Sequence, residues 1–317
     1  MFKHHSYNRS HEEKFIIFIK KDNSKHIPFH YIWQVKKAGP IGVFDSGYGG
    51  LTVLKALTSQ LPQYDYLYLG DNARVPYGTR SFETVYQYTL ECVEALFAQG
   101  CHLVVLACNT ASAKALRSIQ QNDLPKIAPQ RRVLGVIRPT TEEAGLLTQS
   151  GHIGVLGTTG TVLSNSYPIE IAKFFPELQV SQEACPMWVP LIENDEHLGP
   201  GAAYFLNKHL QSLLQKDPAI DAVILGCTHY PLLQNALESL TAGKVKFIAQ
   251  GTLVAQKLEH YLERHPEIAA LCSKQGSRQF FTTDEARNFE EKARLFYGEN
   301  IQANHLDVST IVFSPDV

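Results

Sequence analysis

Short apolar runs that end in glycine or a polar residue recur along the chain from residue 41 onward, and stretches with helical periodicity separate them. This alternation limits the fold strongly, because strands joined by helical crossovers pair in parallel and are covered by helices on both faces. It predicts an α/β fold with mostly parallel sheets. The expected strands are 41–47, 66–71, 102–108, 132–137, 153–160, 222–227 and 245–249, and the expected helices include 81–99, 201–215 and 252–264.

An internal repeat divides these runs into two sets. The run "IGVFDSG" at residue 41 returns as "IGVLGTTG" at residue 153, and the cysteines of "VVLACNTAS" and "VILGCTHYP" are separated by a similar interval. Together with a length of 317 residues, this repeat predicts two similar α/β domains. The expected domains are residues 39–134 plus 245–317, with Asp45 and Cys108, and residues 135–244, with Cys227.

The first 38 residues differ in composition from the rest. They contain eight Lys or Arg and three acidic residues, whereas the whole chain has a formal net charge of -2. We interpret residues 1–38 as a basic, flexible extension. The near-neutral total predicts no nucleic-acid binding, and the lack of an apolar run of roughly 18 residues predicts no membrane span. We expect a cytoplasmic location, where the six cysteines are thiols.

Two cysteines, Cys108 and Cys227, follow expected strands and precede small polar residues. A cysteine at this place commonly opens the next helix, whose N–H groups and dipole lower the thiol pKa. If the two halves face each other, the sulfurs flank one ligand from opposite sides. Two equivalent groups suit inversion at a carbon acid, in which one removes a proton and the other delivers one. Because ligands bind beyond the carboxyl ends of parallel strands, we expect the active site in the cleft between the domains.

Other motifs have an ordinary structural explanation beside a functional one. Asp45 and Ser46 in "FDSGYGG" either belong to an anion-binding turn or cap the next helix. The "PYG" at 76–78 is also a common turn sequence. "CTH" lacks the paired spacing of a zinc site, and "GYGG" matches no nucleotide motif, so we expect no metal and no cofactor. Cysteine is commonly buried, and we interpret four cysteines as core residues: Cys92, Cys101, Cys185 and Cys272.

Taken together, "FDSGYGGLTVL", "YLGDNARVPYG", "VVLACNTASA", "GVIRPT", "VPLIE" and "ILGCTHYPLL" resemble, in this order, the motifs of bacterial glutamate racemases. These enzymes belong to the cofactor-independent aspartate/glutamate racemase superfamily. The resemblance covers about residues 40–300, and the two cysteine motifs with the DSG-x-GG turn are its most specific part. It implies a two-base racemisation of L- and D-glutamate without pyridoxal phosphate or metal, which supplies D-glutamate for peptidoglycan.

The resemblance also implies residue roles. Cys108 is expected to act as the base toward D-glutamate and Cys227 toward L-glutamate, with Asp45 and His229 as auxiliary groups that also contact the substrate. Glu193 matches a carboxylate near the amino-acid site, although a solvated loop acid would explain it equally simply. The positions matched to the substrate's carboxylate and amino groups are Ser46, Tyr77, Gly78, Asn109, Thr110 and Thr228.

The resemblance leaves an alternative substrate and several partners open. The alternative is an aspartate racemase or another isomerase of the superfamily, but Ala111–Ser112 and His229–Tyr230 after the two cysteines favour glutamate. The turn at 249–251 departs from the Asp-Ser-Gly-like turn of many relatives, and we infer no site there. Apart from the substrate glutamate, the partners suggested are a second copy of the chain in a homodimer, a cell-wall nucleotide precursor as activator, and DNA gyrase.

Overall fold

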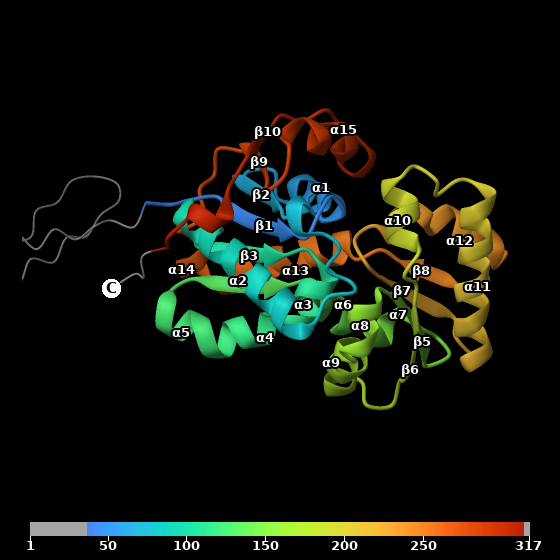
Figure 1. Ribbon diagram of the computed structural model, residues 1–317. Helices are drawn as coiled ribbons and strands as arrows, with labels where there is room; N and C mark the ends of the chain where they lie inside the picture. The colour runs from blue at the N-terminus through green and yellow to red at the C-terminus, as the bar shows by residue number, and fades with distance from the viewer. Residues whose placement is uncertain (1–36, 314–317) are drawn as a thin grey trace, which may run out of the picture. The chain divides into compact units, whose positions relative to one another are not determined.

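Two parallel sheets make up the frame of the computed structural model, which describes residues 37–313 (Figure 1). The strand order is β10-β9-β2-β1-β3-β4 in the first sheet and β6-β5-β7-β8 in the second, and all of these pairs are parallel. The predicted α/β fold with mostly parallel sheets is confirmed. The strands are β1 (Ile41–Asp45), β2 (Tyr66–Gly70), β3 (Leu103–Leu106), β4 (Arg132–Gly135), β5 (His152–Gly157), β6 (Gln179–Ala184), β7 (Ala222–Gly226), β8 (Lys246–Ile248), β9 (Arg278–Thr282) and β10 (Ala303–His305).

Helices connect the strands, and the three expected from periodicity are present as α2, α11 and α13. Helix α2 begins after Ser81, whose side chain accepts a hydrogen bond from the Thr84 N–H at 3.1 Å. The α-helices are α1 (Leu51–Gln60), α2 (Phe82–Ala98), α3 (Asn109–Lys114), α4 (Leu116–Ser118), α5 (Leu124–Ile127), α6 (Ile137–Thr141), α7 (Ala144–Leu147), α8 (Thr159–Leu163), α9 (Ser166–Phe174), α10 (Trp188–Glu193), α11 (Pro200–Lys216), α12 (Gln234–Leu240), α13 (Gly251–Arg264), α14 (Pro266–Ala269) and α15 (Ala286–Tyr297).

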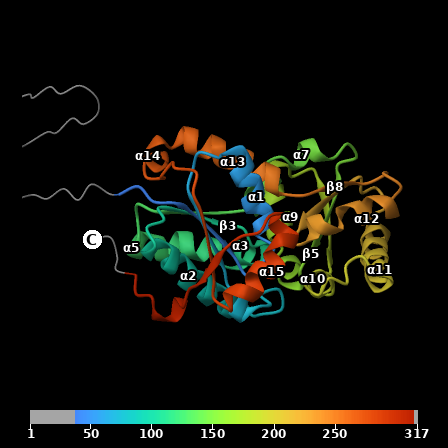
Figure 2. The same ribbon diagram turned by 90° about the horizontal axis from the view of Figure 1, so that it is seen from above.

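Helices cover the first sheet on both faces. Successive strand residues point to opposite sides of the sheet, so they pack alternately against the two helical layers. Ile41 and Val43 belong to a core shared with α1, α13 and α15, whereas Phe44 belongs to a core shared with α2 and α3. Figure 2 shows α1 and α13 on one side of β3 and α2, α3 and α5 on the other. Two helical layers therefore leave only the ends of the strands accessible for a binding site.

The second sheet is covered in the same way. Val155 and Ile224 pack with Tyr167 and Ile171 of α9, while Leu225 packs on the other face with α11. Its strand order matches the β2-β1-β3-β4 part of the first sheet, with β5 in the place of β1 and β7 in the place of β3. The internal repeat in the sequence thus corresponds to two sheets of the same topology.

The division into two domains stays a prediction. The expected boundary between residues 244 and 245 does not coincide with the division of the strands between the two sheets. Lys246–Ile248, which lie in the range expected for the first domain, form β8 and pair with β7 of the second sheet. The reason is local: the crossover after β7 returns the chain beside the same strand, as the crossover from β3 to β4 does in the first sheet. The expected extension at 1–38 lies, apart from its last two residues, outside the described residues.

Three strands were not expected from the sequence. β6, with the sequence QVSQEA, and β10, with ANH, are the edge strands of their sheets and have few apolar residues. β9 has only two buried residues, Phe280 and Thr282. Strands with a solvent-facing side do not form the continuous apolar runs used for prediction. None of the helices within residues 37–313 is both long and apolar enough to cross a bilayer.

Candidate active site

A cavity of about 330 Å³ opens where the carboxyl ends of strands from both sheets meet. Ser46 and Cys108 reach it from the ends of β1 and β3, and Thr158, Cys185 and Cys227 from the ends of β5, β6 and β7. This agrees with the rule that open α/β sheets bind ligands beyond their carboxyl ends. All but one of the residues expected at the site line this cavity: Ser46, Tyr77, Gly78, Cys108, Asn109, Thr110, Glu193, Cys227, Thr228 and His229.

Cys108 is held by neutral groups. It is the residue before α3, and its Sγ accepts a hydrogen bond from the Ala111 N–H at 3.4 Å. The Ser46 hydroxyl lies 3.4 Å from the same sulfur. Burial, reinforced by the nearby Asp45, raises the pKa of Cys108 to about 12. The expectation that the helix start lowers this pKa is therefore wrong in this structure, because burial outweighs the two hydrogen bonds.

Cys227 is instead accompanied by a charged pair. Its Sγ lies 3.8 Å from His229 Nδ1, and His229 Nε2 lies 2.9 Å from Glu193 Oε1. Burial alone would lower the pKa of His229, but the hydrogen bonds to Cys227 and Glu193 outweigh it and raise the pKa to about 10. These contacts therefore favour the protonated form of His229. A 3-10 turn, Tyr230–Leu233, follows Cys227 in place of the α-helix that follows Cys108.

Asp45 is the expected residue that does not line the cavity. Its side chain is fully buried at the end of β1, where Oδ2 accepts the Gly47 N–H at 2.8 Å and Oδ1 accepts the Thr228 hydroxyl at 3.4 Å. Burial raises the pKa of Asp45, and the positive His229 opposes this rise. Asp45 therefore connects the end of the first sheet with the turn that bears Cys227.

Glycines in the turn after Asp45 allow this close approach. A Cβ atom at Gly49 would lie 2.3 Å from His229 Nδ1, and one at Gly50 would lie 2.5 Å from the Cβ of Asp45. Both separations are far below van der Waals contact. Helix α1 begins after Gly50 without a side-chain cap, so neither Asp45 nor Ser46 serves as its cap. Of the two explanations for the turn, helix capping is excluded.

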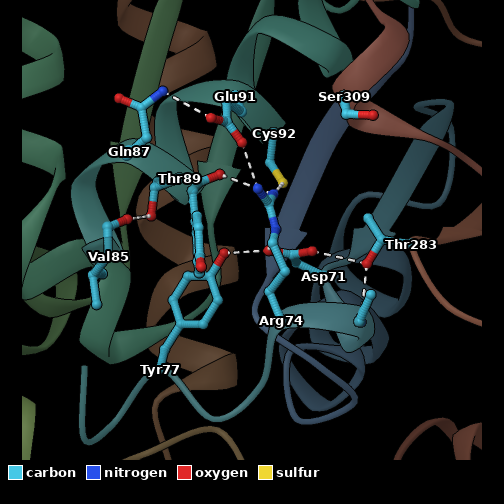
Figure 3. A network of polar contacts seen from close by, with 12 residues as sticks. Asp71, Arg74, Tyr77, Val85, Gln87, Thr89, Glu91, Cys92, Thr283 and Ser309 are labelled. Carbon is cyan, nitrogen blue, oxygen red and sulfur yellow. Dashed lines mark hydrogen bonds and ion pairs between the residues drawn. The ribbon is translucent and has the colours of Figure 1, made fainter. Parts of the chain in front are cut away.

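Tyr77 belongs to a network of polar contacts, which Figure 3 shows. Its hydroxyl donates to the fully buried Asp71, which also forms an ion pair with Arg74 at 2.7 Å and accepts the Thr283 hydroxyl at 2.8 Å. Arg74 extends the network to Glu91. The hydroxyl of Tyr77 is therefore engaged with Asp71, while the residue also lines the cavity. The network fixes the loop from Val75 to Thr79 that lines one wall.

Hydroxyl and amide groups join the two sheets beside the cavity. The Gly78 carbonyl accepts the Gly160 N–H at 2.7 Å, and the Thr110 and Thr158 hydroxyls lie 2.9 Å apart. Tyr167 donates to Asn109 Oδ1 at 2.6 Å. The buried Nδ2 of Asn109 has no hydrogen-bond partner among the described residues. A buried donor without a partner is costly, so this amide is available for a ligand oxygen.

Sequence reasoning missed several lining residues. Thr158 and Thr159 follow β5, and applying the strand-end rule to "IGVLGTTG" would have found them. Cys185 was interpreted as a core residue; it is 1% exposed and also lines the cavity, because it follows the unpredicted strand β6. Burial raises its pKa well above the usual range, so this thiol is neutral. Val189, Pro190 and Asn194 belong to the same group and come from α10 and its end.

Thiols, hydroxyls and amides line the cavity together with apolar side chains. Nowhere in residues 37–313 do three His, Cys, Asp or Glu side chains gather in a way that could hold a metal ion. A larger hollow of about 430 Å³ lies beside β9 and β10, but neither cysteine motif reaches it. The volume near the two thiols falls at the small end of the range for small-molecule pockets.

Comparison with known proteins gives consistent results. The family model for Asp/Glu/Hydantoin racemase matches residues 41–258. A glutamate racemase from Geobacter metallireducens is 40% identical over 259 residues, 81% of this chain and 92% of the relative. Glutamate racemase from Francisella tularensis in complex with D-glutamate has a TM-score of 0.76 at 31% identity, covering 86% of this chain and 99% of that chain. The Escherichia coli glutamate racemase, solved with L-glutamate and the activator UDP-MurNAc-ala, has a TM-score of 0.67 at 27% identity, covering 84% and 97%.

Proposed function

The chain belongs to the Asp/Glu/hydantoin racemase family, and from this premise we propose that it is a glutamate racemase, supplying D-glutamate for peptidoglycan. One observation carries the proposal: two thiols, Cys108 and Cys227, line one small cavity from equivalent strands of two sheets. Inversion at Cα needs a base on one face and an acid on the other. Two groups of the same kind serve both directions of such a reaction.

The two thiols have different surroundings, and we propose different roles for them. His229 Nδ1 lies 3.8 Å from the Cys227 sulfur, within reach for proton exchange, so in this proposal Cys227 removes the Cα proton of L-glutamate. Cys108, with a pKa of about 12, is a neutral thiol that delivers its proton to the opposite face. In the reverse reaction Cys108 is the base toward D-glutamate and Cys227 is the acid.

The Cα proton of an amino acid is very weakly acidic, so the site must also stabilise the carbanion. We assign this to donors that hold the α-carboxylate in a dry cavity, above all the unpaired amide of Asn109 with Thr110 and Thr228. Glu193 orients His229, and Asp45 supports the turn beside both thiols. Ser46, Gly78 and Tyr77 complete the substrate wall, although the Tyr77 hydroxyl is engaged with Asp71.

Hydrogen exchange in D2O tests the proposal directly. Protein dialysed free of small molecules and given no cofactor is expected to exchange the Cα hydrogen of both enantiomers of glutamate for deuterium. NMR of the Cα position measures this, with both enantiomers of aspartate as the comparison. Absence of exchange with either glutamate enantiomer contradicts the proposal. Faster exchange with aspartate would move the assignment to an aspartate racemase.

Other partners follow from the relatives only. The activator bound to the Escherichia coli enzyme supports the proposal that a cell-wall nucleotide precursor activates this chain as well. The six cysteines are all free thiols, which supports the proposed cytoplasmic location. A homodimer and binding to DNA gyrase stay predictions.

A further inference from the structure

Helix α15 packs against the first sheet, but it also contacts His229 and Glu193, which lie beside Cys227 of the second sheet. The Tyr48 ring, in the glycine-rich turn, stacks on Phe289 at 5.5 Å and on Phe296 at 6.1 Å between ring centres. Phe296 also meets the His229 ring edge-on at 5.0 Å. One helix face therefore contacts both the turn after β1 and the histidine beside Cys227.

Lys292 lies on the same face and makes the most specific of these contacts. Its Nζ donates a hydrogen bond of 2.6 Å to the main-chain carbonyl of Glu193, while lying 5.8 Å from the centre of the Tyr48 ring. Glu193 is the last residue of α10. Carbonyl groups in the last turn of a helix lack an intrahelical partner, and a lysine is a favourable group to satisfy them. Lys292 thus anchors the backbone of the residue whose carboxylate holds His229.

We propose that Lys292 is a positioning residue for the Cys227 half of the reaction. The chain of contacts runs from Lys292 through the Glu193 backbone to the Glu193 carboxylate, then to His229 and the Cys227 sulfur. Lys292 touches neither the cavity nor a thiol, so its effect on catalysis is indirect. The inference rests on the proposed racemase function and adds a residue from a helix that carries none of the recognised motifs.

The overall rate of racemisation does not distinguish an effect on proton removal by Cys227 from an effect on proton removal by Cys108. Because the enantiomers have equal free energies in water, any variant must change kcat/KM equally in both directions. A one-base reaction avoids this limit. With glutamate that carries chlorine at Cβ, one thiolate removes the Cα proton, the electron pair forms the Cα–Cβ double bond, and chloride leaves. The enamine then becomes an imine, which water hydrolyses to 2-oxoglutarate and ammonium.

The test compares Lys292→Met with the wild type in this elimination. Because misplacing a catalytic group by an ångström lowers rates by up to ~100-fold, we expect kcat with the L-analogue, for which Cys227 is the base, to fall about 10-fold. The D-analogue, for which Cys108 is the base, should react at the wild-type rate. Lys292→Arg keeps a donor and should restore most of the lost rate. Methionine keeps an apolar stem against Tyr48, so the aromatic packing of α15 is retained.

The matched control is Arg287→Met, which removes an exposed cation from the same helix and should leave both eliminations unchanged. An equal loss with both analogues would show that Lys292 supports only the fold and would overturn the inference. So would a Lys292→Met variant with wild-type rates. If the wild type does not racemise glutamate at all, the proposed function fails first, which separates the two outcomes.

Discussion

Cys108 and Cys227 follow equivalent strands in two sheets of the same order, yet their neighbours differ. Cys108 has a serine hydroxyl and a backbone N–H, and Cys227 has a histidine paired with a glutamate. The shared topology explains where the sulfurs lie, and the neighbours give one sulfur a neutral side and the other a histidine–glutamate pair. In the proposed site, the two sides that act on mirror-image amino acids are thus chemically unlike.

The largest expected effect comes from removing either thiol. Cys108→Ala and Cys227→Ala should each lower racemisation by about 1000-fold or more, because one face of the substrate loses its proton carrier. With the chlorinated analogue, Cys108→Ala should still eliminate from the L-form and Cys227→Ala from the D-form. Coupled assays of 2-oxoglutarate measure this. The buried Cys101, which precedes β3 and does not line the cavity, gives the control Cys101→Ala, which should racemise normally. Wild-type racemisation by either active-site variant would remove that cysteine from the mechanism.

Removing the neighbours of the thiols should have smaller and unequal effects. His229→Asn takes away a charged proton-handling group and should slow racemisation about 100-fold. Ser46→Ala takes away one neutral hydrogen bond, worth about 1 kcal/mol, and should slow it only about fivefold. Steady-state rates measured by circular dichroism compare the two. Equal losses would contradict the proposed difference between the charged and neutral sides.

The last expected effect concerns stability and not rate, and it should appear in the pH dependence of unfolding. His229 has a folded pKa of about 10 against an ordinary 6.5, so its stabilisation is complete below about 6.5 and is lost as the pH rises through 10. Cys108, raised from 9.0 to about 12, loses its contribution only above about 9. Urea unfolding at pH 7 and pH 9 should therefore show a decline in wild type and in Cys108→Ala that is reduced in His229→Asn. A decline unchanged in His229→Asn would mean that the histidine is not protonated in the folded state.

Much of the fold could be predicted because its central strands are buried on both faces. β1, β3 and β7 read as continuous apolar runs, and their polar ends indicated the site. β6 and β10 could not be found, since edge strands with polar residues resemble loops in a sequence. With β6 unseen, Cys185 was interpreted as packing although it lies beside the site.

The sequence indicated most of the residues that line the cavity but not the contacts between their side chains. The strand-end rule indicated Cys108 and Cys227, and the family resemblance indicated Glu193. That Glu193 holds His229 and that Lys292 holds Glu193 depends on packing between segments far apart in the chain. The pKa of Cys108 also depends on burial by distant residues, so an argument from its own helix start led to the wrong direction.

The two glycines of the turn have a consequence for protein engineering. A substitution at Gly49 pushes an atom into His229, and one at Gly50 pushes an atom into Asp45. A mutant library that aims to change the accepted amino acid should therefore leave these two codons untouched. Its diversity is better placed at Val189 and Asn194, which line the cavity without belonging to the acid–base groups. Any racemase that is redesigned from this scaffold will inherit its glycine turn.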